Sequence, residues 1–480
     1  MKNIFKRKEK KHRGGSAIKR NFSMAQTNRL FGDWNVEGMG SDINALLFSK
    51  LELIRKRARD LEVNSPWARR FFSMAKTNIV GPTGFRLSAQ GQSRTKKPDT
   101  EGNMEIERLW KVWASPENCT MSGTQSLIDF CNLAVLRMLS DGEFILRKIE
   151  GADNEFGFAL APLPIDRLNQ NKNRVRTSTQ NAIIMGVEID EWGKPIKYYF
   201  QDPQQNDVVY NADEIIHLFP RERVGQTRGF PFIISGGARA KMLNAFEDAV
   251  VTNKRIAASK MGFFIQDPDN PPASQYEGDG ENADGSTRDV VEPGVMEALP
   301  AGYKGFEAFD PADAGDGFKE FSEQVLRSLA SAWNVNYNTL ANDLTGVNYS
   351  SIRHGAIEDR DAWMCMQQFI IDHLLKPIYK DWLKWALTKA DTFLSATSYK
   401  KFMRISFYGR RWDWIDPLKE EAANNKGLIN NSTSEIAIAR KSGRDFEDIV
   451  AERVRAKELL EKAGLAVVGA KEEVEVSNAD

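Results

Sequence analysis

Two long helical patterns bracket an acidic insertion in the middle of this 480-residue chain, and this arrangement restricts its fold more than any other feature. From Ser235 to Met261, apolar residues recur on one side of a predicted helix, which Gly262 ends. From Phe318 to Trp333, apolar residues again recur every three or four positions and form one stripe. The chain therefore contains two helices interrupted by a segment of a different kind.

The charge of this region is strongly polarised, although the whole chain is neutral with 66 Lys and Arg against 66 Asp and Glu. The insertion, Asp267 to Asp316, is rich in Gly and Pro and carries thirteen acidic residues against two basic ones, a balance of −11. The preceding stretch, Arg221 to Lys260, carries eight basic residues against three acidic ones. Composition alone does not indicate a nucleic-acid-binding protein, so any electrostatic role must come from this distribution.

The residues before the first long helix predict a mixed α+β region. Helical spacing covers Ser41 to Thr77 with an interruption at Ser65-Pro66, then Asn103 to Trp113 and Leu127 to Leu139. Asp141-Gly142 ends the last of these helices and opens a strand from Glu143 to Ile149. Short alternating segments then predict strands at Ala159 to Leu163, Ile183 to Asp190, Lys197 to Phe200, Asp207 to Tyr210 and Ile215 to Phe219. The turn residues Glu191 to Pro195 predict an antiparallel hairpin.

The residues after the second long helix begin with a polar turn, Asn342 to Ser351. Helical periodicity then runs from Ile352 to Lys389, and Pro377 is expected to kink or break it. The C-terminal part predicts a strand, Lys401 to Tyr408, and helices at Pro417 to Lys426, Ser434 to Lys441 and Phe446 to Ala463. At the other end, the first twenty residues carry nine Lys or Arg against Glu9, which predicts a disordered arm.

No catalytic or metal-binding motif is found. Cys119, Cys131 and Cys365 lie far apart and never form CxxC, which argues against a disulfide framework and a zinc site. The four histidines are scattered, and His217 is predicted to be a strand residue that faces a partner. No apolar run approaches the ~20 residues of a transmembrane helix. The sequence predicts no cofactor, although its many carboxylates leave a two-metal nuclease open as an alternative.

Five short segments, in this order, resemble the lambda-type family of tailed-bacteriophage portal proteins. They are Arg57-Ala58-Arg59-Asp60-Leu61 with Asn64-Ser65-Pro66-Trp67-Ala68, then Asn78-Ile79-Val80-Gly81, Asp141-Gly142-Glu143, Asn348-Tyr349-Ser350-Ser351 and Trp414-Ile415-Asp416-Pro417-Leu418-Lys419-Glu420. The last two, about sixty residues apart, are the most specific. The resemblance spans Asp42 to Gly464, so the basic leader and the acidic tail depart from the family pattern.

The resemblance implies a mainly helical α+β portal-type fold, with a mixed α+β wing, a helical stem, a small β-containing clip and a helical crown. The corresponding segments are a basic, disordered arm at 1–40, the wing at 41–234, the first stem helix at 235–262, the acidic clip insertion at 263–317, the second stem helix at 318–341, the channel loop at 342–351, a long helix and return to the wing at 352–415, crown-like helices at 416–465 and a disordered acidic tail at 466–480.

The resemblance further implies a non-enzymatic, homo-oligomeric ring, usually of twelve subunits, at one capsid vertex, with double-stranded DNA passing through its channel. The implied partners are terminase, which would consume the ATP, the head-completion or adaptor proteins, and the scaffolding and major capsid proteins, with no membrane. The implied location is the virion, after assembly in the host cytoplasm. The competing hypotheses are a capsid-associated metal-dependent nuclease and a DNA-binding packaging adaptor.

The candidate site residues fall in the loop and the first stem helix. In the loop they are Asn342, Asn348, Tyr349, Ser350 and Ser351, and in the helix they are the basic residues Lys241, Lys254, Arg255 and Lys260. The hypothesis for the loop is that Asn342, Asn348 and Ser350 contact the DNA backbone. The alternative is that Asn348, Ser350 or Ser351 caps the next helix, and both roles stay open.

A second aromatic and basic cluster lies near the C-terminal helices. Trp412 and Trp414 stand beside Arg410 and Arg411, which is a combination found where bases stack on proteins. Duplex DNA in a channel exposes no base faces, so packing is the favoured role for both tryptophans.

Overall fold

The computed structural model describes residues 42–93, 97–259, 262–266, 268–269, 280–281, 287–288, 303–308, 317–412, 417–441 and 446–463. The predicted basic arm, the predicted acidic tail and most of the acidic insertion lie outside these residues. The described part combines many helices with small antiparallel sheets, so the predicted α+β class with a helical majority is confirmed. The division into wing, stem, clip and crown stays a prediction.

The body begins with two helices, α1 (Ile43–Asn64) and α2 (Pro66–Ile79), that meet at the predicted interruption. The hydroxyl of Ser65 accepts a hydrogen bond from the backbone N–H of Ala68 at 3.5 Å and so caps the start of α2. Pro66 fits the first turn of α2, because an N–H group there would have no partner within the helix. Three further helices complete this part of the body: α3 (Thr100–Trp113), α4 (Pro116–Cys119) and α5 (Leu127–Ser140).

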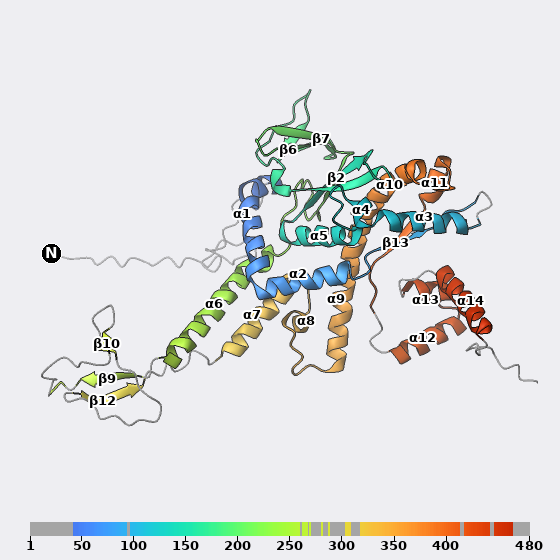
Figure 1. Ribbon diagram of the computed structural model, residues 1–480. Helices are drawn as coiled ribbons and strands as arrows, with labels where there is room; N and C mark the ends of the chain where they lie inside the picture. The colour runs from blue at the N-terminus through green and yellow to red at the C-terminus, as the bar shows by residue number, and fades with distance from the viewer. Residues whose placement is uncertain are drawn as a thin grey trace, which may run out of the picture.

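Two antiparallel sheets cover one side of these helices (Figure 1). The first has the order β3-β2-β8, from β2 (Phe144–Glu150), β3 (Phe158–Leu163) and β8 (Ile215–Leu218). The second has the order β4-β5-β6-β7, from β4 (Ala182–Ile184), β5 (Val187–Ile189), β6 (Pro195–Gln201) and β7 (Asp207–Asn211). A two-stranded pair, β1 (Arg86–Ala89) with β13 (Ile405–Tyr408), joins distant parts of the sequence.

One predicted strand is wrong, because Ile183 to Asp190 forms two strands rather than one. Ile184 pairs with Val187, so β4 and β5 form a tight hairpin whose two turn residues are Met185 and Gly186. Both have positive φ angles, 47° and 85°, as a two-residue hairpin turn requires. The apolar alternation continues through the turn, which is why the pattern hid it. The next hairpin, β5–β6, is confirmed where it was predicted.

The main core is aromatic and lies between α3, the sheet β3-β2-β8 and the later helix α10 (Lys376–Lys389). The ring centroid of Trp110 lies 4.8 Å from that of Trp113 and 4.9 Å from that of Trp382. The indole N–H of Trp113 donates to the carbonyl oxygen of Phe158 at 2.9 Å, so this deeply buried polar group is satisfied. Residues from both halves of the chain therefore share one core.

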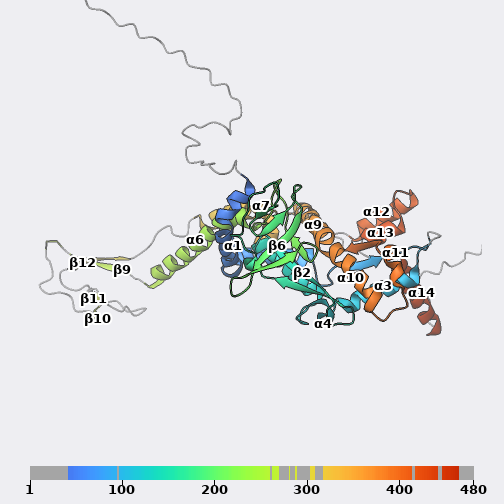
Figure 2. The same ribbon diagram turned by 90° about the horizontal axis from the view of Figure 1, so that it is seen from above.

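The two predicted long helices leave this body together as α6 (Ile234–Ser259) and α7 (Phe318–Ala332). Figures 1 and 2 both show α6 extending away from the body, with β9 (Gly262–Gln266) and β12 (Tyr303–Ala308) beyond its far end. A second short pair is formed by β10 (Gly280–Glu281) and β11 (Thr287–Arg288). The helices pack on each other through Phe246 of α6, whose ring centroid lies 5.7 Å from that of Phe318 and 4.9 Å from that of Phe321.

The predicted second stem helix, 318–341, is interrupted. It ends at Ala332, Asn334 adopts a left-handed backbone with φ 54°, and a separate short helix, α8 (Tyr337–Ala341), follows. The predicted channel loop is shorter than 342–351, because α9 (Tyr349–Ile370) already begins at Tyr349. Polar side chains cap the starts of the two helices that follow α7, Asn336 at α8 and Asn348 at α9.

Pro377 is expected to kink or break the helix, and the structure shows an altered helical turn just before it without a break. A π-helical turn (Ile371–Leu375) joins α9 to α10, and Pro377 lies in the first turn of α10. The wider hydrogen-bonded turn accommodates the missing N–H and the ring of proline, so helical structure continues from Tyr349 to Lys389.

The C-terminal part contains a 3-10 turn (Ala396–Ser398), α11 (Tyr399–Phe402), β13 and three more helices. The predicted strand from Lys401 is wrong in its first part, because Lys401 belongs to α11 and the strand begins at Ile405. The last helices are α12 (Pro417–Ile429), α13 (Glu435–Lys441) and α14 (Phe446–Lys462), close to the predicted bounds. In the described residues, no helix is long and apolar enough to cross a membrane.

Candidate functional site

In the part of the chain that the structure describes, no three His, Cys, Asp or Glu residues gather in a way that could hold a metal ion. His12 lies outside this part. His217 is confirmed as a strand residue that faces a partner, because its Nε2 lies 2.7 Å from Oε2 of Glu143. His354 lies on α9 and His373 on the π-helical turn. The three cysteines are free, with Cys119 and Cys131 buried and Cys365 exposed.

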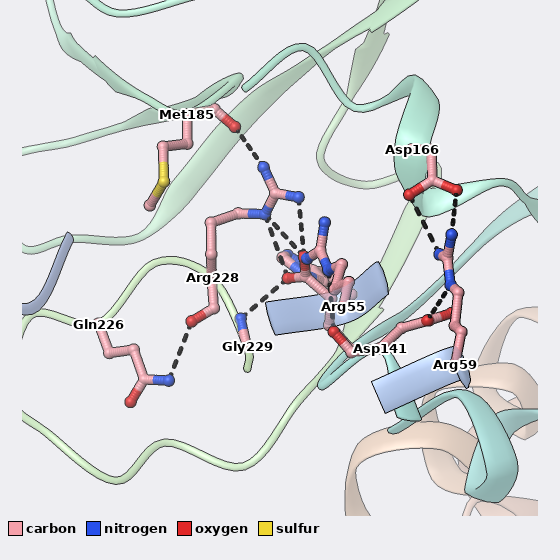
Figure 3. A network of polar contacts seen from close by, with 10 residues as sticks. Arg55, Arg59, Asp141, Asp166, Met185, Gln226, Arg228 and Gly229 are labelled. Carbon is pink, nitrogen blue, oxygen red and sulfur yellow. Dashed lines mark hydrogen bonds and ion pairs between the residues drawn. The ribbon is translucent and has the colours of Figure 1, made fainter. Parts of the chain in front are cut away.

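The most elaborate polar site is a buried charge network centred on Glu143. Figure 3 shows its partners Arg55, Arg228 and Gly229. The side chains of Glu143 and Arg228 are fully buried, and Nη2 of Arg228 lies 2.7 Å from Oε1 of the carboxylate. Arg55 of α1 pairs with the same oxygen. The backbone N–H of Gly229 donates to Oε2 at 2.9 Å, and His217 contacts that oxygen too. One carboxylate thus holds α1, β8 and the segment that enters α6.

A second group of pairs extends the network toward the surface. Arg59 donates through Nε to Asp141 Oδ1 at 2.6 Å and makes two parallel contacts with Asp166, at 2.8 and 3.1 Å. Gly142, between Asp141 and Glu143, has φ +86°, and a Cβ atom there would run into the backbone of Phe230. The close approach of these two backbones requires glycine. The Asp-Gly-Glu segment therefore has a structural role at each of its three positions.

Charge and burial determine the ionisation of the network. Burial alone raises the pKa of Glu143, but the positive charges of Arg228 and Arg55 and the hydrogen bond from His217 hold this pKa well below its ordinary value. Burial lowers the pKa of His217, and the contact with Glu143 offsets only part of this effect. His217 is therefore neutral at neutral pH. Because an ionised carboxylate only accepts hydrogen bonds, we assign the proton of the ring to Nε2.

The network positions the start of the first long helix. Nη1 of Arg228 donates to the carbonyl oxygen of Met185 at 2.7 Å, and the carbonyl oxygen of Arg228 accepts from Gln226 at 2.9 Å. Arg228 lies only six residues before α6 begins at Ile234. Movement of α6 relative to the sheets would therefore disturb buried ion pairs.

The predicted channel loop is held by short-range hydrogen bonds. Asn348 caps α9, because its Oδ1 accepts from the backbone N–H of Ser351 at 2.8 Å, and this confirms the capping alternative without testing a contact with DNA. Asn342 ends α8 in a left-handed conformation with φ 53°. Ser350 is exposed in the first turn of α9. Tyr349 begins α9, and its side chain lies outside the described part.

The predicted basic residues of α6 are not brought together. Lys241 lies at the base of α6, where its Nζ is 3.7 Å from Asp60 of α1. Lys254 and Arg255 are exposed about four turns farther along the helix. Lys260 lies outside the described residues.

Trp412 has a packing role, as the sequence favoured. Its indole N–H donates to Oδ1 of Asn78 at 3.0 Å, and the guanidinium groups of Arg360 and Arg410 each lie 5.8 Å from its ring centroid. Gly81, with φ +73°, lies against the side chain of Arg410. These contacts explain the Asn78 to Gly81 segment, while Trp414 lies outside the described residues.

The Glu143 network was missed by sequence reasoning. The only sequence signals at these residues are the Asp-Gly-Glu segment and the Arg57 to Leu61 segment. Both resemble segments of the portal family, but the resemblance indicates no role for them. The pairing of Glu143 with Arg228 joins residues 85 positions apart, and the sequence contains no spacing that predicts such a pair.

Comparison with known proteins agrees with the resemblance. Residues 27–367 match the family described as "Phage portal protein, lambda family". The probable portal protein of Halomonas phage phiHAP-1 is 31% identical over 445 residues, which cover 90% of this chain and 85% of that protein. Portal protein B of Escherichia phage lambda is 23% identical over 480 residues, which cover 90% and 88%. A solved neck of a native gene transfer agent particle, computed with C12 symmetry, gives a TM-score of 0.44 at 13% identity and covers 81% of this chain and 94% of that chain.

Removal of the central carboxylate is expected to destabilise the protein strongly. Glu143→Ala leaves Arg55 and Arg228 buried without their shared counter-charge, which costs about 3–5 kcal/mol of unfolding free energy. Glu214→Ala is the control, because Glu214 pairs with Arg147 in a partly exposed pair worth about 1 kcal/mol or less. Urea unfolding followed by circular dichroism measures both. Equal losses in the two variants would contradict the assigned role of Glu143.

The lowered pKa values predict a loss of stability in acid. The unfolded chain protonates His217 near its ordinary pKa of 6.5, whereas the folded protein resists this protonation, so stability falls as the pH drops below about 6.5. Glu143 adds a further loss below about pH 4.5, again because the folded pKa is the lower one.

His217→Gln keeps a donor for Glu143 and removes the titration, so the loss between pH 6.5 and 4.5 becomes smaller. His354→Gln, at an exposed position of α9, leaves the profile unchanged. Urea midpoints measured across this pH range provide the comparison, and identical profiles for His217→Gln and the unmodified protein would exclude His217 as the titrating group.

Proposed function

This chain belongs to the lambda family of phage portal proteins, and we propose that its copies close into a ring of twelve, the usual number that the family resemblance implies, at one vertex of a phage capsid. Double-stranded DNA passes through the ring during packaging and ejection. The ring docks terminase during packaging and head-completion or adaptor proteins afterwards, and it meets scaffolding and major capsid proteins during assembly. It provides a conduit and performs no catalytic step.

The observation that carries the ring proposal is the exposure of apolar side chains on α6. Met242 is 71% exposed and Val251 is 69% exposed, although Phe246 of the same helix packs against α7. Met242 and Val251 are nine residues apart, which places them on opposite sides of an α-helix. Within its own subunit, α6 packs on α7 and leaves apolar residues uncovered on two opposite sides. Each of these sides could be covered by one of the two neighbouring subunits of a ring. Such contacts between two different faces close a ring when the rotation is right.

The distribution of charge supports passage of DNA without tight binding. Duplex DNA carries one negative charge per ~1.7 Å, and a uniformly basic channel would hold it against sliding. The exposed Lys254 and Arg255 are few, and the insertion that follows α6 is strongly acidic in sequence. We infer that the scattered basic residues guide the DNA. The acidic insertion, at the mouth of the channel, repels the DNA and so prevents tight binding there.

The loop between α8 and α9 is proposed to narrow the channel. Asn342 and Asn348 are exposed at its two ends, so their neutral amide groups are available to the DNA backbone in addition to their roles at the helix ends. Neutral hydrogen-bonding groups hold DNA less tightly than charges do, which suits a contact that must slide.

A charge on the exposed apolar side of α6 is expected to impair assembly. Val251→Asp puts a carboxylate into the proposed subunit contact, and we expect the ring fraction to fall by about tenfold or more. Val175→Asp is the control, because Val175 is 85% exposed in a loop beside the second sheet. Electron microscopy with native mass spectrometry counts the products, with rings of twelve expected near about 650 kDa from 54.2 kDa subunits. Normal rings from Val251→Asp would remove this surface from the interface.

Two substitutions separate the DNA contact of the loop from helix capping. Asn348→Ser keeps an oxygen that caps α9 but removes the amide, and Asn342→Gly keeps the left-handed backbone but removes the amide. We expect both variants to form rings that retain clearly less packaged DNA than the unmodified portal, measured by nuclease protection. Asn348→Ala additionally loses about 1 kcal/mol of helix capping. Full DNA retention by the first two variants would leave these residues with structural roles alone.

A further inference from the structure

One stretch of the body carries charge of a single sign. From 63 to 98 the sequence contains seven Lys or Arg and no Asp or Glu, although the chain as a whole is neutral. The helix α2 lies in this stretch and holds three of these cations, Arg69, Arg70 and Lys76. No acidic residue within α2 offsets their charge.

The three cations lie on one face of α2. Positions 66, 69, 70, 73, 76 and 77 fall within an arc of about 120° on a helix with 100° per residue, and the residues at all six are exposed. The opposite face is buried in the main core, with Phe71 and Phe72 among its residues. Ser73 and Thr77 add hydroxyl groups to the exposed face, and α2 exposes no large apolar side chain. This face is therefore wholly polar and basic.

The charge of this face is not neutralised within the described part of the chain. No carboxylate of that part pairs with Arg69, Arg70 or Lys76, and Nη2 of Arg70 contacts only the carbonyl oxygen of Thr339, at 3.5 Å. The preceding helix α1 differs, because its Lys56 pairs with Glu52 and its Arg59 with Asp141. The cations of α2 are thus available to a ligand from outside.

Two arginines extend the charge at the C-terminal end of α2. Nη1 of Arg410 donates to the carbonyl oxygen of Thr77 at 2.6 Å, which offsets the negative end of the helix dipole. Arg411 is exposed next to it. Nε2 of Gln367 donates to the carbonyl oxygens of Asn78 and Arg410, at 3.2 and 3.0 Å, and so fixes the two segments to each other. The charged surface is therefore held in place before any ligand arrives.

We propose that this charged face of α2, formed by Arg69, Arg70, Ser73, Lys76 and Thr77 with Arg411 beside it, binds the sugar-phosphate backbone of double-stranded DNA. Lys, Arg, Ser and Thr side chains are those that contact phosphates in protein–DNA complexes. Arg69 and Lys76 stand about 10 Å apart along the helix, which matches the rise of about three base pairs. The contact is independent of base sequence. It requires neither the ring nor the channel, and it lies on the body rather than on α6 or the loop at 342–348.

The composition of the face favours DNA over an acidic protein segment. Protein interfaces have an apolar centre, and the exposed face of α2 offers none. The acidic insertion of this chain is also carried away from α2, because β9 and β12 lie beyond the far end of α6 (Figures 1 and 2). Fixed cations with interspersed hydroxyl groups suit a regular polyanion such as the DNA backbone.

The test is the binding of a short fluorescent DNA duplex to the full-length protein, followed by fluorescence anisotropy between about 50 and 200 mM salt. The variant combines Arg69→Gln, Arg70→Gln and Lys76→Gln, which are exposed positions where substitution leaves the fold intact. We expect its affinity to fall by about tenfold or more. The slope of log K against log salt should become shallower by about two to three, because each lost phosphate contact contributes about 0.9.

Two control variants separate the face from the total charge. Arg69→Lys with Arg70→Lys keeps all charges, so most of the affinity and of the salt slope is retained. Arg167→Gln with Lys194→Gln and Lys197→Gln removes the same charge from exposed positions on or beside β6, and binding stays close to that of the unmodified protein. Equal losses in the two charge-removing variants would overturn the inference, because binding would then depend on net charge alone.

Electron microscopy of the same samples distinguishes this inference from the proposed function. Normal rings of the α2 variant with unchanged DNA affinity would overturn the inference and leave the conduit in place. Loss of rings in the α2 variant alone would identify the face as a subunit contact and would also overturn it. Unmodified protein that binds DNA through this face but forms no ring would contradict the proposed function and support the inference.

Discussion

The buried carboxylate of Glu143 is the interaction on which the arrangement of the body and α6 depends. It is fully buried and receives two guanidinium groups, an imidazole N–H and a backbone N–H from segments that are distant in the sequence. A buried charge of this kind is strongly destabilising if any major partner is removed, so its partners are held together. Arg228 and Gly229, just before α6, are among these partners, and the direction of α6 follows from them.

Polar side-chain contacts also hold the loop between α8 and α9 to the helices around it. Arg327 of α7 contacts Tyr337 of α8, Tyr337 donates to Asp343, and Asp359 of α9 holds the start of α8. The loop is therefore connected to the long helices by ordered side chains rather than by a flexible linker. Under the proposed function, this connection would keep the width of the channel constant at the loop while DNA moves past it.

The exposed apolar residues indicate how the subunit is completed. The aromatic core around Trp382 is closed within one chain, whereas Met242 and Val251 on α6 and Leu344 in the loop remain uncovered. Burial of such side chains is favourable, so a subunit that exposes them on different faces is built for association. Under the proposed function, folding of the subunit and assembly of the ring use separate sets of apolar residues.

The sequence by itself determined the class of the fold, most helix bounds and the family. Helical spacing, Ser65-Pro66 and Asp141-Gly142 act over a few residues, so the pattern predicts their effect without tertiary contacts. It did not show the hairpin turn at Met185 and Gly186 or the π-helical turn before Pro377, where local geometry overrides apolar spacing. Only the tertiary structure decided that Glu143 meets Arg55 and Arg228, that Trp412 packs near Arg360 and Arg410 and that Leu344 is exposed. Such contacts join residues tens to hundreds of positions apart, and no local pattern in a single sequence records which distant side chain will fill a given space.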